Sequence, residues 1–218
     1  MRSLPGYFEH INGKTYLDRY PKIIIKISEL KNKVLAEFGA GWGNDINWLI
    51  NNGFNPKDLF YTEIDDEAFE HAIKNLKEVF GVYSSNLLLR DSRSTGLKEN
   101  FADFVYANNM LHCLETRNNI MIVLKETYRI LKNSGVLFGR TLLNKIDKQK
   151  LQSISSPKDD NEKFSILTAK ALHDGILVGL TKDELKKMAN QVGFTKVYIE
   201  LKPWKWKPTT DLYFRFEK

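Results

Sequence analysis

The sequence predicts a single α/β domain over residues 1–218, with a mainly parallel sheet and helices on both of its faces. Three observations indicate this class. Short apolar segments alternate with amphipathic segments of helical period, early apolar segments end in acidic residues, and a glycine-rich loop follows the first of them. Such alternation requires right-handed crossovers that cover both faces of the sheet. A hydrophobic content of 42% is enough for one core.

The helical segments are recognised by their apolar period and by the residues at their ends. Pro21 suits the first position of a helix. Asp66 can cap a helix that Gly81 ends, and Thr181 with Glu184 matches a capping box. One helix is expected to begin at Pro21, with Ile23, Ile24 and Ile27 on one face. Further helices are expected over 46–50, 66–80, 117–132 and 182–192. The helix over 66–80 is expected to bury Phe69, Ile73, Leu76 and Phe80.

Strands are predicted where short apolar or β-branched runs lie between turn residues. They cover 33–38, 59–62, 86–90, 101–107, 136–142, 196–201 and 210–216. A polar, proline-containing stretch at 144–165 interrupts the alternation, so residues 143–180 are expected to form an insertion or lid before the last helix, with disorder as the alternative. Residues 1–30 are expected to form an N-terminal cap segment.

The loop from Glu37 to Gly43 reads Glu-Phe-Gly-Ala-Gly-Trp-Gly. Alternate glycines allow a sharp turn off the strand and a close approach to a ligand, because no Cβ obstructs either. A dinucleotide loop places a pyrophosphate here, which a neighbouring acid disfavours. Glu37 therefore argues against NAD and favours a ligand with an ammonium group, such as the methionine part of S-adenosylmethionine. A tight turn without a ligand is the alternative.

Five motifs in order resemble the class I S-adenosylmethionine-dependent methyltransferases. They are the Glu37–Gly43 loop, Glu63 ending the second strand, Asp91 after the third, the 101–105 strand followed by Asn109-Met110-Leu111-His112, and the segment from Tyr128 to Leu137. The resemblance covers roughly residues 30–142 and, more loosely, the Gly193-Phe194 helix end and the closing strands. Trp42 inside the loop, and Asn133-Ser134 in place of the more usual proline-glycine, depart from the pattern.

The resemblance implies a Rossmann-like, doubly wound sheet of seven strands with an antiparallel last strand, and S-adenosylmethionine as the cofactor. It places the glycine loop near the methionine end, Glu63 on the ribose hydroxyls and Asp91 on the adenine amino group, and a carboxylate suits both because it accepts hydrogen bonds. Asp65 is assigned to the start of the next helix rather than to the ribose. The residues expected to bind the cofactor are Glu37, Phe38, Gly39, Ala40, Gly41, Gly43, Glu63, Ile64, Asp91, Ser92 and Asn108. No metal site is expected, because Cys113 is the only cysteine.

Methyl transfer from a sulfonium needs mainly alignment and removal of water, because the leaving group is already good. Where the acceptor must lose a proton, His112 is the candidate catalytic residue, and packing of the following helix is the alternative. Glu115, His173 and His10 are weaker candidates. The run Asn108-Asn109-Met110-Leu111 lacks the two prolines and the aromatic residue of adenine and glutamine amide methyltransferases, so that substrate class is not expected.

The acceptor pocket is expected outside the shared core, with Trp204, Trp206, Tyr7, Phe8, Tyr16 and Tyr20 as an aromatic wall or as a cover for the sheet edge. The expected function is methyl transfer to a small-molecule acceptor, with an RNA or protein methyltransferase, or a non-catalytic cofactor-binding partner, as alternatives. A net charge of +6 allows a nucleic-acid partner, which the scattered lysines do not favour. The N-terminus lacks a signal peptide and no apolar run reaches membrane length, so a cytoplasmic protein without a membrane partner is expected.

Overall fold

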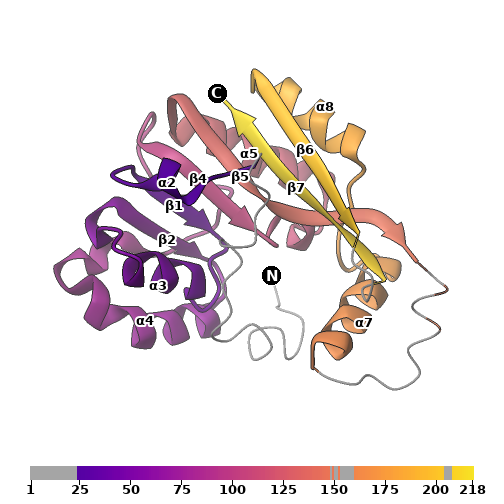
Figure 1. The fold of residues 1–218 in the computed structure, drawn as a ribbon, viewed down its shortest axis with the longest axis horizontal. Helices are drawn as coiled ribbons and strands as arrows, with labels where there is room; N and C mark the ends of the chain where they lie inside the picture. The colour runs from indigo at the N-terminus through magenta and orange to yellow at the C-terminus, as the bar shows by residue number, and fades with distance from the viewer. Residues whose placement is uncertain (1–23, 148, 150–151, 153–159, 204–207) are drawn as a thin grey trace.

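The computed structural model describes residues 24–147, 149, 152, 160–203 and 208–218. Seven strands form one sheet in the order β3-β2-β1-β4-β5-β7-β6 (Figure 1). β7 runs antiparallel to its neighbours β5 and β6, and the other six strands run parallel to one another. The predicted Rossmann-like sheet with an antiparallel last strand is therefore confirmed.

Each predicted strand appears close to its expected position. The strands are β1 (Leu35–Phe38), β2 (Leu59–Glu63), β3 (Leu87–Leu89), β4 (Ala102–Asn108), β5 (Leu131–Ile146), β6 (Lys196–Pro203) and β7 (Thr209–Glu217). The helices are α2 (Ile27–Leu30), α3 (Asn44–Asn51), α4 (Asp66–Phe80), α5 (Arg117–Ile130), α7 (Asp160–His173) and α8 (Lys182–Val192), with short 3-10 turns η2 (Pro56–Asp58), η3 (Gly81–Asn86) and η4 (Leu111–Cys113).

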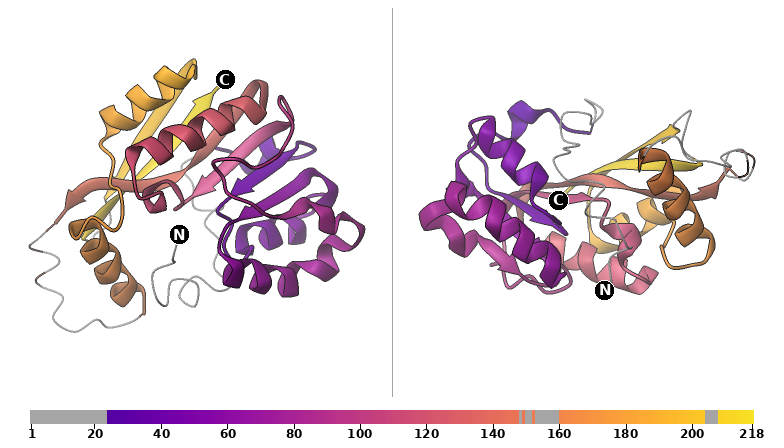
Figure 2. Two further views of the ribbon diagram at one scale, coloured as in Figure 1. Left: turned by 180° about the vertical axis from the view of Figure 1, so that it is seen from behind. Right: turned by 90° about the horizontal axis from the view of Figure 1, so that it is seen from below.

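Helices cover both faces of the sheet. The view from behind in Figure 2 shows α5 and α8 crossing one face, where Phe38, Val105 and Leu137 pack against Leu124 and Leu185. α2, α3 and α4 lie on the other face, where a second cluster contains Leu35, Tyr61, Tyr106 and Phe138 from the strands and Leu30, Ile46 and Leu76 from the helices. Successive side chains along each strand point to opposite faces of the sheet and so pack alternately in the two cores.

The helix ends follow the expected chemistry, with one correction. Thr181 and Glu184 form the capping box of α8, and Gly193 ends that helix in a left-handed conformation at φ 114°. Asp65 rather than Asp66 caps α4, because its Oδ1 accepts a hydrogen bond from the Ala68 amide at 2.9 Å. Of the described helices, none has both the length and the apolar character needed to cross a membrane.

The start of the described chain differs from the prediction. The helix expected from Pro21 is represented in the described residues by one turn, α2, and Ile24 and Ile25 are buried in the segment before it. Pro21, Ile23 and the other residues up to 23 lie outside the described residues.

The region predicted as an insertion or lid contains regular structure. β5 extends beyond the predicted 136–142 at both ends: it begins at Leu131, which pairs with Ala102 on β4, and continues to Ile146, which pairs with Thr209 on β7. α7 occupies 160–173, and its Ala171 and Leu172 pack with Leu142 and Leu177. Among the described residues, part of the 143–180 segment is therefore an extension of the fold.

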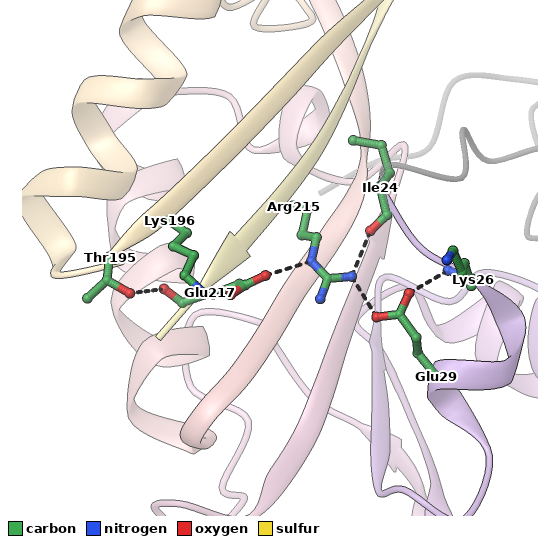
Figure 3. A network of polar contacts seen from close by, with 7 residues as sticks. All are labelled: Ile24, Lys26, Glu29, Thr195, Lys196, Arg215 and Glu217. Atoms are coloured by element: carbon green, nitrogen blue, oxygen red, sulfur yellow. Dashed lines mark hydrogen bonds and ion pairs between the residues drawn. The ribbon is translucent and has the colours of Figure 1, made fainter.

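A chain of ion pairs connects the N-terminal helix to the last strand (Figure 3). The Arg215 guanidinium on β7 donates to Glu29 on α2 at 2.9 Å, to the Ile24 carbonyl at 3.2 Å and to Glu217 at 3.0 Å. Lys196 on β6 reaches the other oxygen of Glu217 at 2.9 Å. One guanidinium thus joins segments 191 residues apart.

Replacing Arg215 with methionine is expected to lower the free energy of unfolding by about 1–3 kcal/mol, because the half-buried Glu29 and Glu217 carboxylates lose a charged donor. Denaturant titration monitored by circular dichroism measures the change. Lys196→Met is the control: its side chain is 62% exposed, so its loss should have a much smaller effect. Equal losses in the two variants would contradict this account of the network.

Candidate active site

The loop after β1 turns through three glycines. Gly39, Gly41 and Gly43 have φ values of 63°, 56° and 73°, a region that other residues enter at a cost. Gly43 is also required by space, because a Cβ there would lie 2.5 Å from Leu76 Cδ1 on α4. Gly43 is the N-cap residue of α3, and its lack of a side chain lets α4 pack close to the loop.

Glu63 connects the end of β2 to the glycine loop. Its Oε2 accepts a hydrogen bond from the Gly41 amide at 2.8 Å, and its Oε1 accepts from the amides of Ile64 at 2.7 Å and Asp65 at 3.0 Å. The side chain is buried, and burial raises its pKa although the three amides act in the opposite direction. A carboxylate in this position holds the loop and keeps lone pairs for a ligand.

Glu37 is the most isolated acid of the site. Its side chain is 3% exposed, and its Oε2 has no hydrogen-bond partner within the described parts of the chain. Burial raises its pKa well above the ordinary value, and the charges of Asp45 and Glu63 raise it further. Phe38, the next residue, points to the opposite face and packs in the α5 core, so only its backbone belongs to the site.

The expected adenine end combines an ion pair with exposed apolar side chains. Asp91 follows β3, and its carboxylate accepts hydrogen bonds from the Arg93 amide at 2.8 Å and from the Arg93 side chain. Burial opposes the charge on Asp91, but the Arg93 hydrogen bonds prevail and lower its pKa. Ile64 and Leu89 are 37% and 39% exposed at the ends of neighbouring strands. Ser92 is buried beside Asp91.

Several residues of the site were not predicted. Asp45, in the first turn of α3, accepts a hydrogen bond from the Tyr106 hydroxyl at 3.0 Å and lies 3.5 Å from the amide nitrogen of the predicted Asn108. The Tyr61 hydroxyl donates to the Gly41 carbonyl. The only sequence signal for Asp45 was an acid two residues after the last glycine, which also suits a helix N-terminus.

The bulky side chain of Trp42 points away from the glycine loop, toward α4. Its ring stacks on that of His71 from α4, with the centroids 4.0 Å apart and the planes 3° from parallel. The indole therefore fastens the loop to α4. The predicted aromatic wall of Tyr7, Phe8, Tyr16, Tyr20, Trp204 and Trp206 lies outside the described residues, as does His10.

A buried polar cluster lies just after the end of β4, beside the middle of β5 and the start of β7. The Nδ1 atom of His112 is 3.3 Å from the Thr141 hydroxyl, and Arg140 donates to Asn109 at 3.1 Å and to Asp211 at 3.3 Å. Burial lowers the pKa of His112 to about 3, the charge of Arg140 lowers it too, and Asp211 opposes them. Its imidazole is therefore neutral and weakly basic. The weaker candidate Glu115 has a left-handed backbone, and His173 is exposed.

The residues present fit S-adenosylmethionine. The unsatisfied Glu37 Oε2 is an acceptor that an ammonium group would satisfy, and the three glycines give the loop the left-handed backbone that turns it sharply off β1. The exposed Ile64 and Leu89 flank the Glu63 position as an adenine ring would require. Acid, glycine loop and apolar flank thus meet at one edge of the sheet.

Comparison with known proteins agrees with this geometry. A family model described as "Methyltransferase domain" matches residues 36–139. The 1,6-didemethyltoxoflavin-N1-methyltransferase of Burkholderia thailandensis, solved with S-adenosylhomocysteine, has a TM-score of 0.62 at 15% identity, over 90% of this chain and 75% of that one. A SAM-dependent methyltransferase of Archaeoglobus fulgidus has a TM-score of 0.60 at 13% identity, over 84% and 85%.

A further solved structure, described as a possible histamine N-methyltransferase from Thermotoga maritima, has a TM-score of 0.57 at 15% identity, over 90% of this chain and 85% of that one. No curated protein matches the chain by sequence. At these identities the solved structures establish the shared fold.

Glu63→Ala is expected to weaken binding of S-adenosylhomocysteine by roughly 100-fold, and Asp91→Ala by roughly 10-fold. The difference arises because Glu63 also holds the Gly41 amide, whereas Asp91 is bound to Arg93 rather than to the loop. Isothermal titration calorimetry on both variants measures the two losses. The ranking is wrong if Asp91→Ala proves the more damaging.

The His112 ring is expected to stay neutral from about pH 8 down to about pH 5, since burial keeps its pKa near 3. Its ring-proton resonance in NMR, assigned by comparison with His112→Gln, should not move over that range. A shift with a midpoint near the ordinary histidine value would restore His112 as a general base.

Proposed function

Because the chain belongs to the class I S-adenosylmethionine-dependent methyltransferase family, we propose that it methylates a small-molecule acceptor that enters beside the carboxyl end of β4, next to Arg140 and Thr141 on β5. The cofactor supplies an activated methyl group on a sulfonium, so the protein's contribution is alignment and removal of water.

The cofactor roles that we propose follow the position of each residue. Glu37 and the glycine loop hold the amino-acid end, Glu63 the ribose, and Asp91 with Ser92 the adenine edge. Asn108, at the end of β4, lies between these residues and the acceptor side, where it approaches Asp45. Parallel strands present their carboxyl ends at one edge of a sheet, which is the usual location of ligands in such folds.

The observation that carries the acceptor proposal is the burial of the polar cluster beyond Asn108. His112 and Arg140 are each 4% exposed, Asp211 is 1% exposed and Thr141 is fully buried. Hydrogen-bonding groups at this depth suit an acceptor small enough to be enclosed, because a folded RNA or protein would meet mainly surface groups. Figure 1 shows β5 and β7 reaching past β4 beside α7, which extends this side of the molecule.

The role that we propose for His112 is positioning rather than proton removal. Its neutral ring shares a hydrogen bond with Thr141, next to the Arg140 and Asp211 ion pair. Arg140 in turn contacts Asn109 in the turn after β4, through both its backbone carbonyl and its side chain. These contacts fix the turn between the cofactor side and the acceptor side, and alignment of this kind is what an in-line displacement requires.

The test is transfer of a labelled methyl group. We expect incubation of the protein with methyl-labelled S-adenosylmethionine and a cell extract, divided into small molecules, RNA and protein, to place label in the small-molecule fraction. Glu63→Ala serves as the control and should give far less label at the same cofactor concentration, because it binds the cofactor weakly. Label found only in RNA or only in protein would overturn the proposed acceptor class.

A further inference from the structure

Glu37 lies between two tyrosines whose hydroxyl groups donate their hydrogen bonds to other residues. It pairs in register with Tyr61 on β2 and with Tyr106 on β4, so the three side chains project from the same face of the sheet. A phenol has one proton to donate. Tyr61 donates to the Gly41 carbonyl and Tyr106 to Asp45, which explains why Oε2 of Glu37 has no donor among the described residues.

The charged groups that act on Glu37 are themselves acids. Asp45 reaches it from α3 and Glu63 from β2, and both favour a proton on Glu37 in addition to the effect of burial. Among the described residues, the phenols of Tyr61 and Tyr106 also lie on this face, and burial and the neighbouring carboxylates raise the pKa of Tyr61, so that it stays neutral. His71 on α4 stacks on Trp42 of the glycine loop, and the charge of Glu63 also acts on the buried Cys113 thiol. Asp65 lies beyond Glu63 and acts on Tyr61.

The three buried acids are not equivalent. Glu63 accepts hydrogen bonds from three backbone amides, and Asp45 accepts from the Tyr106 phenol and the Asn108 side-chain amide, whereas Oε2 of Glu37 has no donor in the described chain. Hydrogen bonds to a carboxylate stabilise its ionised form, and a buried acid without them keeps its proton. Of the three, Glu37 therefore has the least support for its ionised form.

We propose that Glu37 carries a proton in the cofactor-free protein and releases it to solvent when the ammonium group of the cofactor binds beside it, with Asp45 as the positioning residue whose charge sets this exchange. The inference rests on the cofactor and does not depend on the acceptor. The arriving cation takes the place of the proton as the partner of Glu37. The O–H bond of the carboxyl breaks, the electron pair stays on oxygen and the proton passes to buffer.

The sign of the pH dependence follows from this exchange. Binding that releases a proton is favoured by a lower proton concentration, so affinity should rise as the pH rises. The gain is at most about tenfold per pH unit and stops once Glu37 is ionised in the free protein. A titration at a pH below the ordinary pKa of an α-amino group, about 7.7–8.0, keeps the ligand's own ammonium group protonated.

Calorimetric titration with S-adenosylhomocysteine near pH 6.5, in buffers of low and high ionisation enthalpy, counts the protons exchanged. We expect the wild type to release a substantial fraction of one proton and Glu37→Gln to release none. Asp45→Asn should release fewer than the wild type, because Glu37 is then partly ionised before the ligand arrives. Asp103→Asn is the matched control: it removes one acid, paired with Lys132, at the far end of β4, and should leave the count unchanged.

Binding heats that do not depend on the buffer for the wild type would overturn the proposal, as would a Glu37→Gln variant that releases as many protons as the wild type. Circular dichroism confirms that each variant is folded, and Asp45→Asn preserves the shape of the side chain. No acceptor takes part in the titration, so its outcome is independent of the labelled-methyl experiment, and either proposal can fail alone.

Discussion

The hydrogen bonds of Glu63 are the constraint on which the rest of the site depends. One carboxylate joins the end of β2 to the Gly41 amide of the neighbouring loop and to the first turn that leads into α4. The loop is thereby held in a conformation that three glycines make accessible, and Gly43 brings α4 within contact of it. The position of Glu37, Asp45 and the apolar flank relative to one another follows from this attachment.

Much of the architecture could be predicted because the relevant signals are local. The capping box at Thr181, the glycine stops and the alternation of apolar strands with helices each involve residues close in sequence, and all three appear in the structure. The length of β5 could not be predicted, because its extension depends on distant partners: Leu143 pairs with Leu180, and Ile146 pairs with Thr209 on β7, more than 60 residues away along the chain. α7 has little apolar period, and its buried face includes Ser165 and Thr168, so the pattern that reveals an amphipathic helix is missing.

The candidate site divides in the same way. The acids at strand ends could be predicted from the sequence, because parallel strands bring their carboxyl ends together whatever the exact register. The roles of Tyr61 and Tyr106 could not be predicted, because they depend on the position of both tyrosines opposite Glu37. That register is a property of the assembled sheet. Arg93 and Arg140 were missed for a related reason: an arginine in a sequence looks exposed until its buried or paired carboxylate is known.

The position of β7 between β5 and β6 affects the order in which the two halves of the site can be assembled during synthesis. Glu37 and Glu63 lie within strands, and Asp91 lies just after one, and all of these strands and their partner β4 precede residue 109 in the chain. The acceptor side needs Asp211 against Arg140, so it cannot close until residues 209–217 have left the ribosome and entered between strands already present. The acceptor side is therefore the last part of the site to be completed during synthesis.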